Sequence, residues 1–457
     1  MREELKSYLD KILAVYEESR PLSKELYTRA CNSLPGGDTR TATYFAPYPS
    51  FMASGEGAYM TDVDGHRLLD FQNNYTSLIH GHGHKETAEA VSRQMSLGTA
   101  YTAPFEGQLK LAELLTERFP SLDLIRFTNS GTEANMHALR IARAYTGKSK
   151  IIKTEGGYHG TTDVFEASVD PNLKKAGNLD NINVIPESKG VSANALKDVL
   201  VVPFNDIDRT RKIIEENHED VACLIIEPVM GSAGQIAAKP EYLTFLREIT
   251  KKYEILLIFD EVVTGRLSLG GAQQHFGITP DLTSLGKIIG GGTAIGAFGG
   301  RRDIMEMYDP RNKLMYHSGT FNGNAVGMAA GYATMKAYDQ NAVNQVNALG
   351  LRFKEGMVKM YDQLGLNMQI LGVGSLYNTL FTAKEVVNYR DVATAHEDLN
   401  KILFMSLMTK GVFNAERGMF CMSTAMTADD IDFGLLKVKE ALSEMLPVIS
   451  IEAPELL

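Results

Sequence analysis

Lys287 has the setting in this chain that best suits covalent chemistry. It lies in the segment T-S-L-G-K-I-I-G-G-G (283–292), among apolar residues and glycines. A lysine in apolar surroundings loses its water shell, which lowers its pKa and frees a neutral amine that can attack a carbonyl carbon. Taken alone, Lys287 also fits a lysine that caps a short helix in a glycine-rich turn.

An acidic residue precedes Lys287 at the end of an apolar run. The run I-L-L-I-F-D-E-V-V (255–263) predicts a buried parallel strand with Asp260 at its carboxyl end. In open α/β sheets ligands bind at that end, and we interpret the adjacent Glu261 as structural. An acid that pairs with a pyridinium nitrogen and a lysine that forms a Schiff base are the protein groups that pyridoxal phosphate chemistry requires.

That chemistry also requires a phosphate site, and the segment I-R-F-T-N-S-G-T-E-A (125–134) offers one. It predicts a short strand that leads into a helix, with Ser130 as the N-cap and Glu133 completing a capping box. The first turn then presents free backbone N–H groups and the positive end of the helix dipole, so Ser130, Gly131 and Thr132 can hold a phosphate. An ordinary well-capped helix has the same pattern.

Composition and charge exclude several other classes of protein. The chain has 457 residues, of which 44% are hydrophobic and 22% charged, with a net charge of −10 and a sequence pI near 5.6. This acidic balance argues against a nucleic-acid partner, and no apolar run is long enough to cross a membrane. Cys31, Cys223 and Cys421 lack paired spacing, so we expect no disulfide and no metal site. The charged start lacks a signal peptide, and we expect a cytoplasmic protein.

The elements that must position these residues follow from the hydrophobic pattern. Residues 1–30 predict a helix, 34–43 a turn-rich loop, and 58–71 a hairpin around Asp64-Gly65. From about 85 to 330 strands alternate with helices, which predicts an α/β fold with a mostly parallel sheet and helices on both faces. An amphipathic helix capped by Thr427 is expected over 427–442.

The motifs together resemble those of one known family. N-S-G-T-E-A (129–134), E-G-G-Y-H-G (155–160), I-I-E-P-V (225–229), F-D-E-V (259–262), L-G-K-I-I-G-G-G (285–292) and H-S-G-T-F-N-G-N (317–324) occur in this order. The chain thus resembles the class III aminotransferases of the fold-type I pyridoxal phosphate enzymes, from about Pro35 to about Met426. It is most similar to the β-phenylalanine and other β-amino-acid aminotransferases and to glutamate-1-semialdehyde aminomutase.

The resemblance implies an architecture. A large cofactor-binding domain is expected over residues 66–330, and a small α+β domain is expected to form from 1–65 together with 331–457. It also implies a homodimer whose active sites lie at the interface, because Thr320 matches a threonine that reaches the phosphate of the neighbouring subunit.

The resemblance also implies roles in cofactor binding. Lys287 matches the lysine that holds the cofactor and moves the substrate proton, and Asp260 matches the partner of the pyridine nitrogen. Tyr158 matches the aromatic residue stacked on one face of the ring, and Val262 the residue on the other face. The expected cofactor-binding set is Ser130, Gly131, Thr132, Tyr158, His159, Glu227, Asp260, Val262, Lys287 and Thr320. Plainer interpretations remain open: Tyr158 as a loop anchor, His159 as a structural histidine and Glu227 as part of a turn at the end of a strand.

Substrate recognition is expected from arginines, because a planar guanidinium binds a carboxylate through two parallel hydrogen bonds. Arg40 matches the arginine that receives the carboxylate of a β-amino acid, and Arg417 the one that receives the carboxylate of an α-keto acid. Either can instead be a surface arginine, and Glu416 is placed to pair with Arg417. Tyr75 is expected to contact substrate, with Tyr44 and Phe45 as further aromatic walls.

The leading hypothesis is a transaminase that acts on small amino-acid and keto-acid substrates in ping-pong half-reactions, with 2-oxoglutarate or pyruvate as acceptor. The second is a glutamate-1-semialdehyde aminomutase, which Glu416 supports because that group has a glutamate near this position. Two features argue against it: the neighbouring residues Arg417-Gly418 resemble the β-amino-acid group, and the segment 264–271 is shorter than in the aminomutases. A racemase on the same scaffold is third. A non-catalytic regulator that binds the cofactor is a fourth hypothesis, disfavoured by the intact Lys287 and Asp260.

Overall fold

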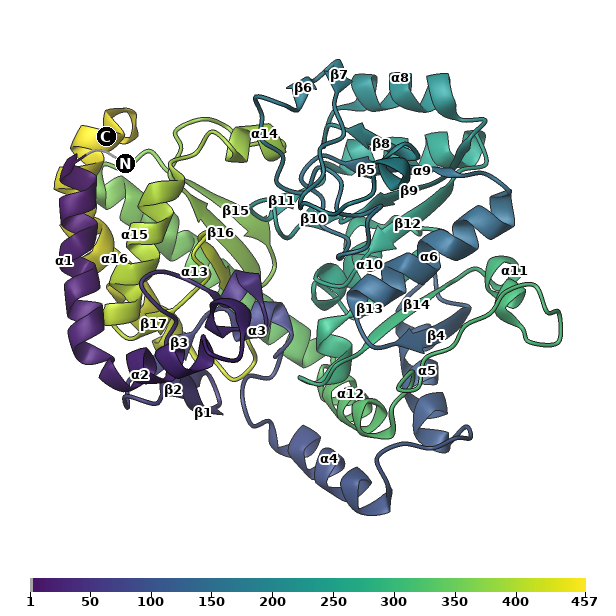
Figure 1. Ribbon diagram of the computed structural model, residues 1–457, viewed down its shortest axis with the longest axis horizontal. Helices are drawn as coiled ribbons and strands as arrows, with labels where there is room; N and C mark the ends of the chain where they lie inside the picture. Colours follow the sequence, from purple (N-terminus) through teal and green to yellow (C-terminus); the bar gives the residue numbers. More distant parts are fainter. Residues whose placement is uncertain (1–2) are drawn as a thin grey trace.

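The computed structural model describes residues 3–457, and a seven-stranded sheet organises one half of it (Figure 1). In spatial order its strands are β4 (Leu124–Thr128), β14 (Gly296–Gly300), β13 (Leu282–Gly286), β12 (Leu256–Asp260), β9 (Val221–Ile226), β5 (Lys150–Thr154) and β8 (Val199–Val202). Only β14 is antiparallel to its neighbours, so the predicted mostly parallel sheet is confirmed.

Helices cover both faces of this sheet because its central strands are apolar on both sides. In β12, Ile258 faces a core that includes α6 (Gly131–Thr146), whereas Leu257 and Phe259 face a core that includes α8 (Ile207–Asn217) and α9 (Pro240–Lys252). Successive side chains of a strand point to opposite faces, so a continuous apolar run is buried on both. The other helices of this half are α4 (Lys85–Leu97), α5 (Glu106–Arg118), α10 (Gly271–Phe276) and α12 (Ala325–Ala337).

The second half of the molecule is built from both ends of the chain, which lie together at one side of Figure 1. One sheet has the order β1 (Met52–Glu56), β2 (Tyr59–Asp62), β3 (Arg67–Asp70) and β17 (Val412–Phe413), and another the order β15 (Gln369–Val373), β16 (Leu376–Leu380) and β18 (Met419–Cys421). The long helices are α1 (Glu3–Ser19), α13 (Gln340–Leu364), α15 (Glu397–Thr409) and α16 (Ala428–Glu452). The domain boundaries expected at residues 65 and 330 stay predictions.

Short elements fill the connections. They are the helices α3 (Asn73–Thr76), α7 (Ala193–Leu196), α11 (Arg302–Met305) and α14 (Tyr389–Val392), the 3₁₀ turns η1 (Pro35–Gly37), η2 (Thr41–Thr43), η3 (Thr264–Arg266), η4 (Lys287–Gly290), η5 (Glu306–Tyr308) and η6 (Pro454–Leu456), and the strand pairs β6 (Gly177–Asn178) with β7 (Asn181–Ile182) and β10 (Val229–Met230) with β11 (Ile236–Ala237). No helix within residues 3–457 is long and apolar enough to span a bilayer.

The N-terminal segment differs from the single helix expected over residues 1–30, of which residues 1 and 2 lie outside the described part. Helix α1 ends at Ser19, and α2 (Pro21–Ala30) begins directly after Arg20. Arg20 has a φ of −127° and a ψ of 53°. The break has a local cause, because the ring of Pro21 disfavours helical backbone in the residue before it.

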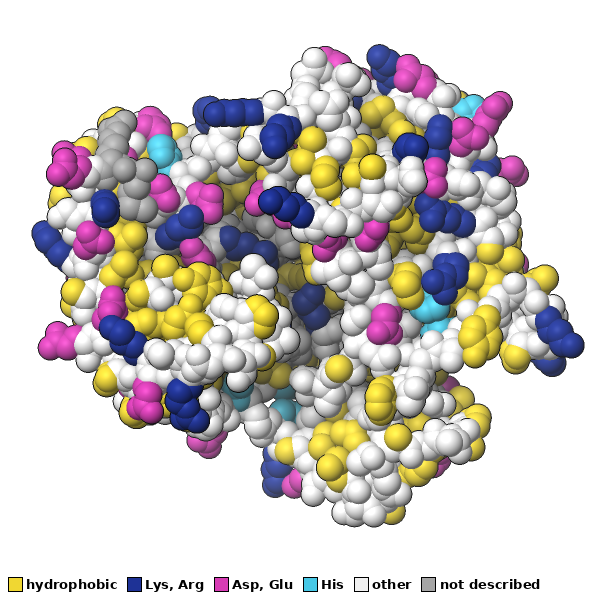
Figure 2. Space-filling view, viewed as in Figure 1, with side chains coloured by type: hydrophobic (Ala, Val, Ile, Leu, Met, Phe, Trp, Pro, Cys, Tyr) yellow, Lys and Arg dark blue, Asp and Glu magenta, His cyan; other side chains and the backbone are white. Residues whose placement is uncertain are grey.

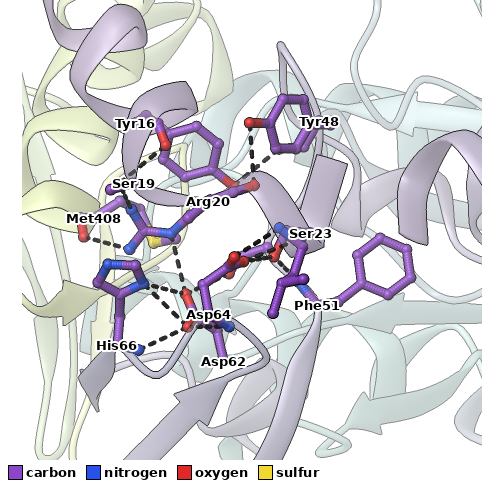
Figure 3. Close-up of polar contacts among 12 residues, drawn as sticks. Tyr16, Ser19, Arg20, Ser23, Tyr48, Phe51, Asp62, Asp64, His66 and Met408 are labelled. Carbon is purple, nitrogen blue, oxygen red and sulfur yellow. Dashed lines mark hydrogen bonds and ion pairs between the residues drawn. The ribbon is translucent and has the colours of Figure 1, made fainter. Parts of the chain in front are cut away.

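Arg20 fixes this break against the rest of the second half (Figure 3). Its Nε donates to Asp62 Oδ2 at 3.1 Å, and its Nη2 donates to the carbonyl oxygen of Met408 in α15 at 3.1 Å. Both side chains of the Arg20–Asp62 pair are buried. In the hairpin turn, Asp64 accepts the N–H groups of Leu22 and Ser23, and so caps the first turn of α2. This cluster thereby sets the direction of α2 and of the loop that follows it, which carries Arg40.

We expect Arg20→Met to destabilise the fold, because it leaves Asp62 buried without its cation. Removal of one partner of a buried ion pair costs about 3–5 kcal/mol. The chain has no tryptophan, so the urea midpoint is followed by circular dichroism. The control is Lys24→Met, which removes a cation paired with Glu17 on the surface and leaves the midpoint unchanged. Equal midpoints for both variants would contradict the role of Arg20.

Candidate active site

Three side chains with chemical potential lie at the carboxyl edge of the seven-stranded sheet. Asp260 is the last residue of β12, Glu227 directly follows β9, and Lys287 directly follows β13. The register brings them close, since Ile226 pairs with Phe259 and Asp260 pairs with Ser284. The sheet therefore collects residues that are far apart in the sequence at one site.

Lys287 has a distorted backbone and a shifted pKa. Its φ is +50°, which is uncommon for a residue with a side chain. Burial lowers the pKa of its amine, and the nearby charges of Asp260 and Glu227 oppose that shift. A lysine with a lowered pKa is a stronger nucleophile at neutral pH, as the sequence suggested.

Asp260 is held by neutral donors. The residue is only 4% exposed. Its Oδ2 accepts a hydrogen bond from Asn135 Nδ2 at 2.7 Å and lies 2.9 Å from His159 Nδ1. Its Oδ1 accepts the backbone N–H of Val262 at 3.1 Å. Burial lowers the pKa of His159, so this imidazole is a neutral donor rather than a cation. The carboxylate therefore lies buried without a permanent cation in contact, which is the arrangement that fits a protonated pyridine nitrogen.

The start of α6 fits a phosphate. Ser130 is the N-cap and its hydroxyl accepts the N–H of Glu133 at 3.2 Å. The Glu133 carboxylate bonds to Asn129 rather than back to Ser130, so only half of the expected capping box forms. The N–H groups of Gly131 and Thr132 have no acceptor within residues 3–457. Two free donors at the positive end of a helix are suited to an anion.

Glycines at this end make room for close backbone contacts. A Cβ at Gly131 would lie 2.9 Å from Val262 Cγ2, and one at Gly160 would lie 2.5 Å from Thr132 Oγ1. Val262 also lies near Gly286, the residue before Lys287. The side chain of Val262 thus lies close to both the start of α6 and the segment that carries the lysine, and its place beside a cofactor ring stays a prediction.

Glu227 anchors the loop that carries Tyr158. Its Oε2 accepts the N–H of Tyr158 at 3.0 Å, and its Oε1 accepts the N–H of Gly231 at 3.2 Å. Burial, followed by the charge of Asp260, raises the pKa of Glu227 to about 8. Tyr158 is 39% exposed, so its ring is open to a ligand.

Helix α14 also holds this loop, which no pattern in the sequence predicted. Arg390 in α14 donates from Nε and Nη2 to both oxygens of Glu155, at 2.7 and 2.9 Å. Tyr389 donates from its hydroxyl to Asp170 Oδ1 at 2.5 Å. Residues 155–160 are therefore fixed from the second half of the molecule as well as by Glu227. Asn135 was also missed, although a polar residue on the apolar face of α6 is a detectable signal.

A cavity of about 600 Å³ contains both predicted substrate arginines in its wall, together with Tyr44, Phe45, Tyr75 and Glu416. Figure 2 shows a hollow between the two halves of the molecule, with basic side chains inside it. Arg40 Nη1 donates to Asn74 Oδ1 at 3.0 Å, and its guanidinium lies 5.7 Å from the centre of the Tyr75 ring. Burial lowers the pKa of Lys287, and the charge of Arg417 contributes to that shift.

The expected pairing of Glu416 with Arg417 is absent within residues 3–457. The two residues occupy the middle of a turn closed by a bond from Gly418 N to Ala415 O, and both line the cavity. Burial raises the pKa of Glu416, and Lys401 in α15 opposes the shift. The Arg417 guanidinium has no carboxylate within ion-pair distance in the described chain, and it is open to the cavity.

Thr320 lies exposed in a loop at the surface and makes no hydrogen bond within residues 3–457. The loop is held by Asn322, whose Oδ1 accepts from Asn129 Nδ2 at 2.8 Å and whose Nδ2 donates to His317 Nε2 at 2.9 Å. Within a single protomer Thr320 thus does not join the residues at the carboxyl edge of the sheet and the start of α6. Its contact with a neighbouring subunit stays a prediction.

The site can support amino-group chemistry on a carbonyl cofactor. Pyridoxal phosphate, when bound, supplies an electron sink that stabilises negative charge on the carbon next to the substrate nitrogen. Lys287 would supply the amine for covalent attachment and, when released, a base for the proton on that carbon. Asp260 would hold a proton on the ring nitrogen, Tyr158 would offer an aromatic face, and the start of α6 would bind the phosphate.

Comparisons with known proteins agree with this geometry. The family model of class-III aminotransferases matches residues 42–442. The chain is 41% identical to glutamate-1-semialdehyde 2,1-aminomutase of Methanothermobacter thermautotrophicus, over 92% of this chain and 99% of that protein. It is similar to the structure of an omega-transaminase from Sphaerobacter thermophilus (TM-score 0.89, 40% identity, 92% and 97% covered). It also resembles a β-phenylalanine aminotransferase from Variovorax paradoxus (TM-score 0.86, 34% identity, 98% and 99% covered).

Reduction with borohydride should fix pyridoxal phosphate to Lys287 and to no other buried lysine. Lys153 is the internal comparison: burial lowers its pKa to about 7, but its Nζ donates to the carbonyl oxygen of Ala167. Peptide mass spectrometry of the loaded, reduced protein should find the adduct on the peptide with residue 287. An adduct on Lys153, or none, would overturn the assignment of Lys287.

Because of Glu227, we expect the free energy of unfolding of the cofactor-free protein to fall as the pH rises. Its folded pKa of about 8 exceeds the ordinary value of 4.5, so between these values the folded state binds the extra proton and stability falls with pH. Glu227→Gln removes this proton uptake. We expect the melting temperature of the wild type to fall roughly 2–4 °C more than that of the variant between pH 5 and 8. The exposed Glu241→Gln should behave as wild type, and parallel curves for all three proteins would contradict the assignment.

Proposed function

Because the chain belongs to the class-III aminotransferase family, we propose that it moves an amino group from a β-amino acid to an α-keto acid such as 2-oxoglutarate or pyruvate. Membership confirms the resemblance and the fold class predicted from the motifs, and pyridoxal phosphate is the cofactor of this family. The observation that carries the proposal is the presence of two guanidinium groups, those of Arg40 and Arg417, in the wall of one cavity.

The two cations suit two successive carboxylate substrates. A guanidinium in a cleft without a carboxylate partner is only partly hydrated, so a substrate carboxylate that pairs with it gains a strong, oriented interaction. Arg417 interacts electrostatically with Lys287 and Glu227, whereas the Arg40 guanidinium lies 5.7 Å from the centre of the Tyr75 ring. A β-amino acid has one more carbon between its nitrogen and its carboxylate than an α-amino acid. We therefore assign the carboxylate of the donor to Arg40 and that of the keto acid to Arg417.

The names of two similar structures support this reading. One is named as an omega-transaminase from Sphaerobacter thermophilus and the other as a β-phenylalanine aminotransferase from Variovorax paradoxus. The apolar part of the cavity wall, which includes Phe45, Phe404 and Phe413, would accept an apolar substituent on the donor.

A glutamate-1-semialdehyde aminomutase is the second candidate, and the sequence comparison favours it. The aminomutase of Methanothermobacter thermautotrophicus and further relatives at 38–40% identity carry this name. Glutamate-1-semialdehyde has one carboxylate, so Arg40 alone would suffice to bind it. Glu416 supported this hypothesis from the sequence; Lys401 opposes its raised pKa, and Glu416 is not among the charges that act on Lys287. The two arginines in the cavity wall favour the transaminase, and the names of the sequence relatives favour the aminomutase.

We place the site in a homodimer. The loop of Thr320 supports this, because Thr320 is exposed and so are three large hydrophobic residues of the same loop, Leu314, Tyr316 and Phe321. Burial of such a loop against a second copy would bring Thr320 to the phosphate end of the partner site.

A visible spectrum separates the two candidates. The protein loaded with cofactor is mixed with 3-amino-3-phenylpropanoate in the absence of a keto acid. A transaminase loses the absorbance of the lysine-bound cofactor and regains it when 2-oxoglutarate is added. A protein that ignores this donor, and that converts glutamate-1-semialdehyde without any keto acid, is an aminomutase.

Single-turnover rates should then separate the two arginines. Arg40→Ala should slow the half-reaction with the β-amino acid about a hundredfold and leave the half-reaction with 2-oxoglutarate nearly unchanged, because a charge-assisted pair is lost only in the former. Arg417→Ala should show the opposite selectivity. Small and equal effects of both substitutions would rule out the assignment of one carboxylate to each arginine.

A further inference from the structure

The segment that separates the two arginines has an exceptional backbone. Asn73, Asn74, Tyr75 and Thr76 have φ values of 49°, 47°, 54° and 75°, so four consecutive residues with side chains form a left-handed turn, α3. In this conformation the Cβ of an L-residue crowds the following carbonyl oxygen, and the cost recurs at every residue. Residues other than glycine normally adopt it singly, so a run of four needs an explanation in its surroundings.

Buried groups hold the turn at both ends. Asp70 is buried, and its Oδ1 accepts the N–H groups of Gln72 and Asn73 at 2.8 and 2.9 Å. Asn73 donates from Nδ2 to the carbonyl oxygen of Cys421 at 2.8 Å. At the other end, the buried Arg266 donates from Nη1 to the carbonyl oxygen of Thr76 at 3.3 Å. The turn is therefore fixed from three other segments of the chain.

The two middle residues of the turn contact the loop of Arg40. Asn74 accepts the Arg40 Nη1 at its Oδ1 and donates from Nδ2 to Ser77 Oγ at 3.1 Å, so its amide is itself held in place. The Tyr75 hydroxyl donates to the carbonyl oxygen of Ala42, and the Tyr75 ring faces the Arg40 guanidinium. Both side chains line the cavity.

Tyr75 shares the cavity wall with Arg417 as well as with Arg40. Burial raises the pKa of the Tyr75 hydroxyl, and the charges of Arg417 and then Arg40 oppose that shift. The charges of both arginines therefore act on this one side chain. Neither Asn74 nor Tyr75 is fully buried, so the strained backbone is not needed to fill a core.

We propose that the left-handed turn Asn73–Thr76 is the element that divides the cavity into two carboxylate subsites. Asn74 is a positioning residue that aims the Arg40 guanidinium, and Tyr75 is the partition that keeps each arginine for one carboxylate. This inference rests on the proposed function, because it names how the same cavity distinguishes the carboxylate of the donor from that of the keto acid. A backbone without the strain would place both side chains elsewhere, so the strain and the selectivity are linked.

The test is Asn74→Gly, measured by stability and by binding. Glycine adopts a positive φ without strain, so the melting temperature should stay equal to that of the wild type or rise, whereas an ordinary structural residue would lower it. Calorimetric titration of the cofactor-loaded protein with 3-phenylpropanoate, which lacks an amino group and cannot react, should show about tenfold weaker binding, because a hydrogen bond to a charged group is lost. KM for the β-amino acid should rise by a similar factor, with the 2-oxoglutarate half-reaction unchanged.

Two matched variants control for strain and for charge. Glu254 has a φ of 53°, is exposed and lies before β12 at the opposite edge of the sheet, so Glu254→Gly should relieve strain without any effect on binding. Asn74→Asp should abolish binding of 3-phenylpropanoate, because its carboxylate would pair with Arg40, whereas Asn194→Asp in α7 adds the same charge on the surface and should have no effect.

The outcomes separate the inference from the function on which it rests. If Arg40→Ala weakens the binding of 3-phenylpropanoate and Asn74→Gly does not, Arg40 is the carboxylate site and the positioning role of Asn74 is wrong. If Arg40→Ala has no effect on this binding, the assignment of the donor carboxylate to Arg40 fails, whatever Asn74 does. A lower melting temperature for Asn74→Gly with unchanged binding would assign the residue a purely structural role.

Discussion

The site depends on a buried carboxylate whose direct hydrogen-bond partners are neutral. Asp260 lies at the edge of the sheet where strands end, and the groups that bond to it, Asn135, His159 and the N–H of Val262, are all neutral donors. Burial of a charge is costly unless it is hydrogen-bonded and paired, and neutral donors meet only the first of these needs. A protonated pyridine nitrogen in contact with Asp260 would meet the second need. Under the role expected for Asp260, the scaffold would thereby favour the protonated form of the cofactor ring.

The same constraint explains why the surrounding charges form a balanced set. Lys287 and Arg417 are opposed to Asp260 and Glu227, and each contributes to the pKa shifts of the others. Burial and then the charge of Asp260 raise the pKa of Glu227 to about 8, so that Glu227 can anchor the Tyr158 loop without adding a second full negative charge at neutral pH. Burial lowers the pKa of Lys287, and Arg417 adds to that shift. A substrate carboxylate that binds Arg417 would cancel that effect, and so would link substrate binding to the protonation state of the lysine.

The sequence predicted what local patterns control, and it missed what distant contacts control. The apolar run that ends at Asp260 and the segment around Lys287 predicted the parallel sheet and the edge where both lie, because hydrophobic periodicity reports burial and strand direction. Asn135, 125 residues from Asp260, and Arg390, 235 residues from Glu155, act through contacts that no local pattern reports. The left-handed turn was missed because tyrosine and threonine disfavour that backbone and asparagine adopts it only as a single residue, so the surrounding bonds are needed to enforce a run of four. Adjacency also misled, since Glu416 and Arg417 form no ion pair with each other within residues 3–457.

The charges of Glu416 and Arg417 bear on the choice between the transaminase and the aminomutase reactions. An aminomutase returns the amino group to the same substrate, so it needs one carboxylate site and must retain its intermediate. A transaminase exchanges substrates, so it needs to bind a second carboxylate after the first has left. In this chain burial lowers the pKa of Lys287 and Arg417 contributes to that shift, whereas Glu416 is not among the charges that act on it. Under the proposed function, Arg417 would attract one substrate carboxylate and Arg40, which lies beside Tyr75, would bind the other. The two guanidinium groups in the wall of one cavity are therefore the feature that supports an exchange of substrates over a return of the amino group to the same substrate.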